Sequence, residues 1–216
     1  QSLFKEVDFV LNPRERVGLV GKNGSGKSTL FKIILNKESA DNGQIVISKN
    51  YRVDSLDQYL KFSYSTVLDE CCSYLPESAK YDEYKAEKIL FGLGFLKEDL
   101  SRDPLEFSGG FQVRIKLAST LVSNPDCLLL DEPTNYLDIL SLRWLKSFLN
   151  NFPGEVLIIT HDRGFMDDVC THVMGIKRGE LKKVKGKTGE YYNIIAEDEI
   201  LYAQTKANLD KKREHL

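Results

Sequence analysis

The fold of this chain is decided by residues 16–28, which read Arg16-Val17-Gly18-Leu19-Val20-Gly21-Lys22-Asn23-Gly24-Ser25-Gly26-Lys27-Ser28. The first five residues form a short, mostly apolar run that predicts a buried strand. The apolar spacing after the glycine-rich loop predicts a helix from Lys27 to about Leu35. The loop fits the pattern G-x-x-x-x-G-K-[ST], in which backbone N–H groups and a helix N-terminus surround a phosphate. A glycine-rich turn without a ligand is the alternative, but the flanking strand and helix favour a nucleotide-binding loop.

The side chains of this loop have separate expected roles. Lys27 is expected to reach the β- and γ-phosphates of a nucleotide, and the Ser28 hydroxyl is expected to hold Mg²⁺. Three glycines allow the backbone to approach the phosphates without Cβ clashes. The expected nucleotide-binding residues are Gly21, Lys22, Asn23, Gly24, Ser25, Gly26, Lys27, Ser28 and Thr29.

A second candidate site follows about a hundred residues later, where an apolar run over 127–130 ends in Asp131-Glu132-Pro133. A strand that ends in aspartate beside a phosphate loop suits Mg²⁺ coordination by Asp131. The next residue, Glu132, is then close enough to orient and deprotonate an attacking water. Taken alone, the pair reads as an ordinary turn after a strand. The preceding phosphate loop favours the catalytic reading.

The rest of the chain alternates between strand and helix patterns. Helical patterns lie within 66–100 and over 109–122, 139–149 and 196–216, the last being an exposed helix that leaves the domain. Strand patterns lie at 7–11, 44–47, 127–130 and 156–160, and a hairpin over 173–181 turns at Arg178-Gly179. Strands that alternate with helices of this length imply a parallel α/β sheet.

Composition excludes several classes of protein. Hydrophobic residues make up 42% and charged residues 29% of the 216, and 30 basic residues against 32 acidic ones give a net charge of −2. Overall charge therefore does not indicate a nucleic-acid binder. The sequence shows neither an apolar run of membrane-spanning length nor signal-peptide features, so we expect a cytoplasmic protein without membrane insertion. The four cysteines lack metal-ligand spacing and are expected to be reduced.

The segment Phe107-Ser108-Gly109-Gly110-Phe111-Gln112-Val113-Arg114 resembles the signature loop of ATP-binding cassette (ABC) ATPases, usually written L-S-G-G-Q. The resemblance implies an α/β, ABC-type P-loop ATPase with a parallel core sheet, an antiparallel β subdomain and a helical subdomain. It implies ATP and Mg²⁺ as cofactors. In the family, the residues equivalent to Ser108, Gly109 and Gly110 contact ATP that is held by an opposing cassette. A second cassette, in the same chain or as a homodimer, is therefore an expected partner.

Other family elements follow in the expected order. Gln58 resembles the Q-loop glutamine and joins Ser28 and Asp131 as an expected metal contact. His161 resembles the switch histidine, which would contact the γ-phosphate, so that Glu132 and His161 are the expected catalytic residues. The segment 135–138 resembles the D-loop at the cassette interface, although its Asp138 equally suits a helix N-cap. The expected interface residues of the D-loop are Asn135, Leu137 and Asp138.

Several details are similar to the ABC-F branch, whose members carry two cassettes on one chain and no membrane domain. These are the approach to the phosphate loop at 14–21, the aromatic Phe111 in the signature, and the segments 131–138 and 159–166, with Tyr136 in place of the usual histidine. The resemblance implies an ATP-binding domain over 1–193, a helical subdomain at about 64–122 and the start of an inter-cassette linker at 194–216. It points to the first cassette of a tandem protein.

ABC-F members typically act on the ribosome, so the resemblance implies a role in translation. The basic residues over 177–187 could contact rRNA phosphates or simply form a solvated hairpin; they are Lys177, Arg178, Lys182, Lys183, Lys185 and Lys187. Two other functions stay open: a nucleotide-binding subunit of an ABC membrane transporter, and a scaffold that binds ATP without turnover.

Two departures limit the resemblance. The adenine-stacking aromatic of the family usually precedes the first residue of this sequence, and a first strand is expected to be missing with it. Gln58 and Ser108 are only 50 positions apart, and the helical subdomain is expected to fill this span. This leaves little room for the long inserted arm that some relatives use to touch tRNA.

Overall fold

The computed structural model describes residues 4–5, 7–56, 61–177 and 179–214, except for the side chains at 201 and 207–214. Within this part of the chain, the strands form a six-stranded sheet in the order β2-β3-β4-β1-β5-β6. Neighbouring strands are parallel, apart from the antiparallel pair β5 and β6. The strands are β1 (Arg16–Val20), β2 (Val53–Ser55), β3 (Cys127–Asp131), β4 (Glu155–Ile159), β5 (His172–Lys177) and β6 (Glu180–Lys185).

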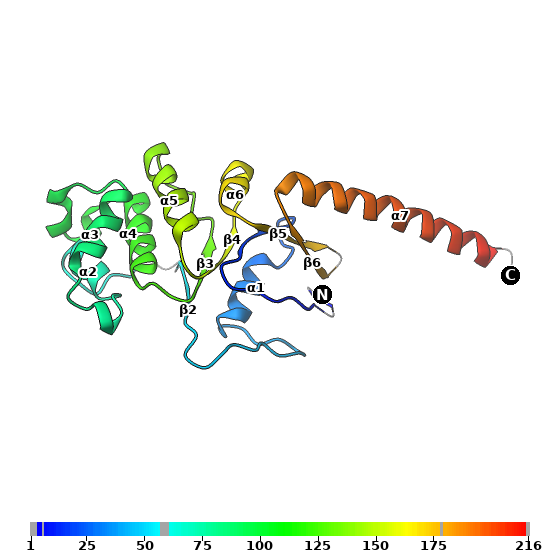
Figure 1. The fold of residues 1–216 in the computed structure, drawn as a ribbon, viewed down its shortest axis with the longest axis horizontal. Helices are drawn as coiled ribbons and strands as arrows, with labels where there is room; N and C mark the ends of the chain where they lie inside the picture. Colours follow the sequence, from blue (N-terminus) through cyan, green and yellow to red (C-terminus); the bar gives the residue numbers. More distant parts are fainter. Residues whose placement is uncertain (1–3, 6, 57–60, 178, 215–216) are drawn as a thin grey trace.

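Helices surround this sheet and form a separate lobe at one end, while α7 leaves at the other end (Figure 1). The lobe contains α2, α3 and α4, together with short 3₁₀ turns. The helices are α1 (Lys27–Ile34), α2 (Val67–Cys72), α3 (Glu83–Gly92), α4 (Gly109–Val122), α5 (Ile139–Asn151), α6 (Arg163–Val169) and α7 (Thr188–Glu214), and the 3₁₀ turns are η1 (Glu77–Ala79), η2 (Lys97–Ser101) and η3 (Pro104–Glu106). This arrangement confirms the predicted fold class.

The central strands β1, β3 and β4 are buried on both faces of the sheet, and successive side chains along each strand point to opposite faces. In β3, Leu128 and Leu130 pack into the cluster that includes α4, α5 and α6. Cys127 and Leu129 face the other way, into the cluster that contains Phe31 of α1. The apolar run that predicts this strand is therefore continuous rather than alternating. β3 ends at Asp131, which is only partly buried and lies at the edge of the core.

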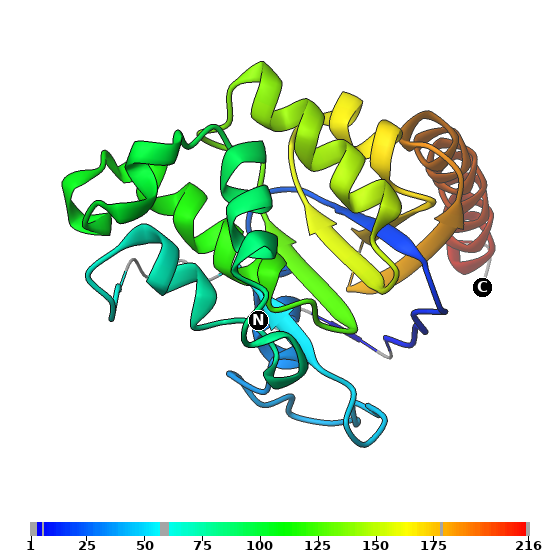
Figure 2. The same ribbon diagram turned by 60° about the vertical axis from the view of Figure 1, so that its left-hand side comes forward.

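Two predicted strands are absent from the described part of the chain. Residues 44–47 form no strand, and the side chains of Ile45, Val46 and Ile47 are exposed. Figure 2 shows this segment in the loop that precedes β2. Residues 7–11 keep the predicted alternation of burial but also form no ladder. A strand needs a hydrogen-bonded neighbour, and neither segment has one among the described residues.

The last helix begins earlier than its sequence pattern predicts, at Thr188 rather than near Ala196. The Thr188 N–H and hydroxyl donate to Asp167 of α6, at 2.7 and 3.1 Å. Tyr191 is buried against Met166 and Val173. These contacts attach the first turns of α7 to the sheet, and Figure 1 shows the remainder extending away from it. None of the helices formed by the described residues has the length and apolar character required to span a membrane.

Candidate nucleotide-binding site

The phosphate loop connects β1 to α1 as predicted. Gly24 and Gly26 have φ angles of +76° and +96°, which favour glycine, and a Cβ on Gly26 would lie 2.9 Å from the ring of Phe4. The Lys27 ammonium folds back over the loop and donates to the carbonyls of Gly21 and Lys22, at 2.9 and 3.1 Å. The positive charge of Lys27 is therefore held beside the first residues of the phosphate loop.

Two side-chain oxygens of the loop fit a phosphate and a metal ion. The Ser25 hydroxyl is buried and has no hydrogen-bond partner within the described structure. The Ser28 hydroxyl donates to Asp131 Oδ2 at 2.9 Å, which joins the start of α1 to the end of β3. Hydroxyl and carboxylate oxygens are the donors that Mg²⁺ prefers. The two predicted metal contacts that the structure describes therefore lie side by side, whereas Gln58 lies outside the described residues.

The predicted catalytic residues follow two neighbouring parallel strands. β3 and β4 pair in register up to Asp131 and Ile159, so the residues after these ends are neighbours. Glu132 has a φ of +50°, and its N–H donates to the Ile159 carbonyl at 2.8 Å. This turn points the carboxylate toward His161, whose Nε2 lies 3.4 Å from Glu132 Oε1. The imidazole itself is 70% exposed and is accessible to a ligand.

These groups line one hollow of about 440 Å³. Its walls are formed by phosphate-loop residues and by the residues at the ends of β3 and β4. Its lining is Asn23, Gly24, Gly26, Lys27, Ser28, Thr29, Asp131, Glu132, Ile159 and His161. The structure thus brings the predicted loop, metal and catalytic residues to one place. Their roles in binding and catalysis stay predictions.

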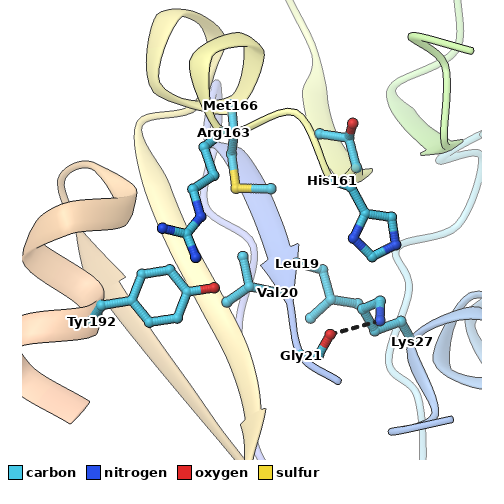
Figure 3. Close-up of a pocket in the computed structure, with 9 residues that line it drawn as sticks. Leu19, Val20, Gly21, Lys27, His161, Arg163, Met166 and Tyr192 are labelled. Carbon is cyan, nitrogen blue, oxygen red and sulfur yellow. Dashed lines mark hydrogen bonds between the residues drawn. The ribbon is translucent and has the colours of Figure 1, made fainter. Parts of the chain in front are cut away.

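A smaller neighbouring pocket shares Lys27 and His161 with this hollow and extends toward α7 (Figure 3). Arg163, the first residue of α6, directs its guanidinium to the Tyr192 ring, 4.7 Å from the ring centroid. Sequence reasoning missed Arg163 because α6 was not predicted, and missed Tyr192 because α7 was predicted to begin after it. The available signal was Asp162, which accepts the Phe165 N–H at 2.9 Å as the N-cap of α6.

The predicted signature residues lie apart from this hollow. Ser108 and Gly109 are exposed at the start of α4, and they do not line either pocket. A Cβ on Gly110 would lie 3.4 Å from Cβ of Tyr136, so the signature and the predicted D-loop are adjacent. This separation is consistent with a signature that serves another cassette, as the resemblance implies.

Arg114 joins the signature helix to the predicted D-loop. Its Nε donates to the Tyr136 carbonyl at 2.8 Å, and its Nη1 donates to the Leu93 carbonyl and to Asp138 Oδ2, at 3.1 and 3.0 Å. Asp138 also caps α5 by accepting the Ser141 N–H at 2.9 Å. This cap, together with Arg114, lowers the pKa of the Asp138 carboxyl. Asp138 is therefore an N-cap, while the interface role of Asn135, Leu137 and Asp138 stays a prediction.

Several lysines of the β5–β6 hairpin have partners within the chain. Lys177 pairs with Glu199 of α7 at 2.7 Å, and Lys182 pairs with Asp198. Lys183 pairs with Glu15 at 2.6 Å. Arg178 lies outside the described residues. These ion pairs favour the structural reading of the paired lysines, and those of Lys177 and Lys182 hold α7 against the hairpin.

Comparison with known proteins adds a separate line of support. A family model described as ABC transporter matches residues 4–135. The ATP-binding protein Uup of Buchnera aphidicola is 34% identical over 99% of this chain, and the ABC transporter F family member 2 of Arabidopsis thaliana is 30% identical over 95%. The probable ATP-binding protein YheS of Escherichia coli is 30% identical over 99%. The matches cover only 36%, 37% and 38% of these relatives, respectively.

Solved structures show the same fold at lower identity. An ATP-binding subunit of an ABC transporter superposes with a TM-score of 0.72 at 23% identity, over 94% of this chain and 93% of that one. A dimeric ATP-binding cassette in a post-hydrolysis state, bound to ADP and phosphate, gives a TM-score of 0.68 at 22% identity, over 85% and 90%.

Proposed function

Because the chain belongs to the ABC transporter family of ATP-binding cassettes, we propose that it binds Mg-ATP, pairs with a second cassette and hydrolyses the nucleotide. The observation that carries this proposal is the hollow in which Lys27 and Ser28 face Glu132 and His161. A phosphate loop alone supports binding. A carboxylate and an imidazole 3.4 Å apart in the same hollow add groups suited to hydrolysis.

Each residue has one task in the proposed reaction. The loop amides and the Lys27 ammonium bind the β- and γ-phosphates, and Ser28 and Asp131 hold Mg²⁺. Mg²⁺, when bound, supplies charge neutralisation on the phosphate oxygens. Glu132 accepts a proton from the attacking water, while His161 contacts the γ-phosphate. Ser108, Gly109 and Gly110 contribute N–H and hydroxyl donors to the nucleotide of the opposing cassette.

Turnover tests the catalytic assignment. We expect Glu132→Gln to lower phosphate release at least about 100-fold, because a general base typically contributes that much or more. ATP affinity should stay within about threefold, since the amide keeps the shape of the side chain. The exposed Glu77 provides the control, and Glu77→Gln should change neither quantity. Unchanged turnover in Glu132→Gln would remove Glu132 from the mechanism.

The predicted ABC-F resemblance is confirmed by relatives that carry the ABC transporter F family name. Since the chain spans about a third of its relatives' length, the activity of the complete protein is a further proposal. We propose that the chain is the first of two tandem cassettes, acts in the cytoplasm and works on the ribosome. The extended α7 supports the tandem arrangement, because a linker to a second cassette would begin within it, at 194–216.

Co-sedimentation with ribosomes tests the proposed ribosomal role. The Glu132→Gln protein should pellet with ribosomes in Mg-ATP but not without it, and higher salt should weaken the association if rRNA phosphates are contacted. A protein that binds ATP and does not pellet in either condition would contradict the proposed ribosomal role of this cassette. A transporter subunit would then be the better reading.

A further inference from the structure

Two threonine hydroxyls connect the segments that carry Glu132 and His161. Thr134 Oγ1 and Thr160 Oγ1 lie 3.1 Å apart and share a hydrogen bond. The Thr160 hydroxyl also accepts the backbone N–H of Asp162, at 3.1 Å. Thr160 is buried, so its hydroxyl depends on these two partners. The pair therefore ties the loop after β3 to the loop after β4.

This tie lies beyond the end of the β ladder. β3 and β4 pair up to Asp131 and Ile159, and one more backbone bond runs from the Glu132 N–H to the Ile159 carbonyl. Glu132 then turns the chain with a φ of +50°, a conformation that a residue with a side chain rarely adopts. The hydroxyl pair supplies a second attachment after this turn.

The two threonines bracket the contact proposed for catalysis. Thr134 follows Glu132 by two residues, and His161 lies between Thr160 and the N–H of Asp162 that Thr160 accepts. The Glu132–His161 distance of 3.4 Å is thus set within a loop pair that is held on both sides. Groups that activate water lose much of their effect when they are displaced by about 1 Å.

We propose that Thr134 and Thr160 are positioning residues that set the geometry of Glu132 and His161. The inference rests on the proposed function, in which Glu132 accepts the proton of the attacking water. Neither threonine is assigned contact with the nucleotide. Their effect should consequently appear in the rate of hydrolysis rather than in the affinity for ATP.

Removal of each hydroxyl tests the proposal. Thr160→Val and Thr134→Val keep the shape of the side chain but cannot form the bond. We expect each variant to lower kcat about tenfold and to leave KM for ATP within about twofold. Thr160→Ser and Thr134→Ser keep the hydroxyl and should stay within about twofold of the parent kcat. The double valine variant should be no slower than Thr160→Val alone, because Thr134→Val removes only the shared bond, whereas Thr160→Val also removes the bond from the Asp162 N–H.

Thr120 offers a matched control for a purely structural loss. Its buried hydroxyl donates to the Lys116 carbonyl at 2.9 Å inside α4, away from the hollow. Thr120→Val therefore removes a buried hydroxyl hydrogen bond without changing the loops after β3 and β4. It should lower the melting temperature, while its kcat stays at the parent value.

The outcomes separate this inference from the proposed function. Full kcat in both valine variants, or serine variants as slow as the valine ones, would overturn the positioning role. If either result occurs while Glu132→Gln is inactive, the proposed function stands and only the positioning role of the two threonines fails. If Glu132→Gln hydrolyses ATP at the parent rate, Glu132 is not the base, and the positioning role that rests on it fails. If the parent protein itself releases no phosphate, the proposed function fails. Labelled phosphate released across a range of ATP concentrations measures all of these rates.

Discussion

Ser28 and Asp131 are 103 positions apart in the sequence, and the Ser28 hydroxyl donates a 2.9 Å hydrogen bond to Asp131 Oδ2. The contact arises because β1 and β3 lie on either side of β4 and run parallel to it, so their ends meet at one edge of the sheet. Each oxygen is held by a regular element, α1 or β3. The pair is consequently prearranged for a divalent cation, which favours oxygen ligands.

Loss of either side-chain ligand should weaken the binding of Mg²⁺, so that more Mg²⁺ is needed for ATP to bind. We expect Ser28→Ala and Asp131→Asn each to raise the Mg²⁺ concentration needed for half-maximal ATP binding about 10- to 100-fold, a range seen even for groups that only orient metal ligands. A Mg²⁺ titration with a fluorescent ATP analogue measures this. Ser48→Ala, at an exposed position, should leave the midpoint unchanged. An unchanged midpoint in Asp131→Asn would argue against the metal site.

Lys27 should contribute to affinity rather than to folding. Its ammonium contacts only two carbonyls of its own loop among the hydrogen bonds of the described residues, at 2.9 and 3.1 Å. We expect Lys27→Ala to weaken ATP binding about 10- to 100-fold, the effect of a lost hydrogen bond to a charged group. Its melting temperature should barely change. Lys32→Ala, which removes an exposed ion pair with Glu38, serves as the control in equilibrium binding measurements.

The sequence predicted the parts of the site that local chemistry determines. The bounds of α4 match those expected, and β1 and β3 agree to within a residue, because apolar spacing and turn residues specify them locally. The strand predicted at 44–47 failed because a strand also needs a neighbour, which no local pattern shows. The pairing of Thr134 with Thr160, and of Lys177 with Glu199, depends on how distant segments pack. Neither hydroxyl stood out in the sequence.

Arg114 should be important for the stability of the helical lobe. The guanidinium is almost buried, and its removal would take a donor from the Tyr136 and Leu93 carbonyls and the charged partner from the Asp138 carboxylate, which would keep only its bonds from Ser141. We expect Arg114→Leu to lower the free energy of unfolding by about 2–4 kcal/mol. Arg114→Lys keeps the charge but cannot span the three acceptors, so its effect should be intermediate. Arg143→Leu, at an exposed position of α5, should change stability little in the same urea titrations.

Glu15 should make folding sensitive to acid. Burial raises the pKa of its carboxyl, but hydrogen bonds from Asn12 and Lys183 outweigh burial and lower the pKa from 4.5 to about 2. The stabilisation is therefore complete above about pH 4.5 and is lost as the pH falls toward 2. It amounts to roughly 3 kcal/mol at most. Glu15→Gln should flatten the dependence of unfolding free energy on pH in this window. If the unfolding free energy of Glu15→Gln depends on pH just as steeply, other carboxylates cause the dependence.

The attachment of α7 should depend on the absence of a side chain at residue 175. A Cβ on Gly175 would lie 1.7 Å from the Tyr191 hydroxyl, and Tyr191 is buried. We expect Gly175→Ala to displace the first turns of α7, to lower the free energy of unfolding by about 1–3 kcal/mol and to increase protease cleavage within this helix. A Cβ on Gly189 would enter open space, so Gly189→Ala should be neutral or slightly stabilising.

A second substitution tells whether Tyr191 is the cause. Tyr191→Leu removes the phenol and should reduce the effect of Gly175→Ala by at least half, because the clashing atom is gone. If Gly175→Ala is equally destabilising in both backgrounds, the strain lies within β5 rather than between β5 and α7. Urea titration of the four proteins gives the coupling free energy. A large coupling would mean that the contact between Gly175 and Tyr191 is one of the contacts through which the sheet holds α7.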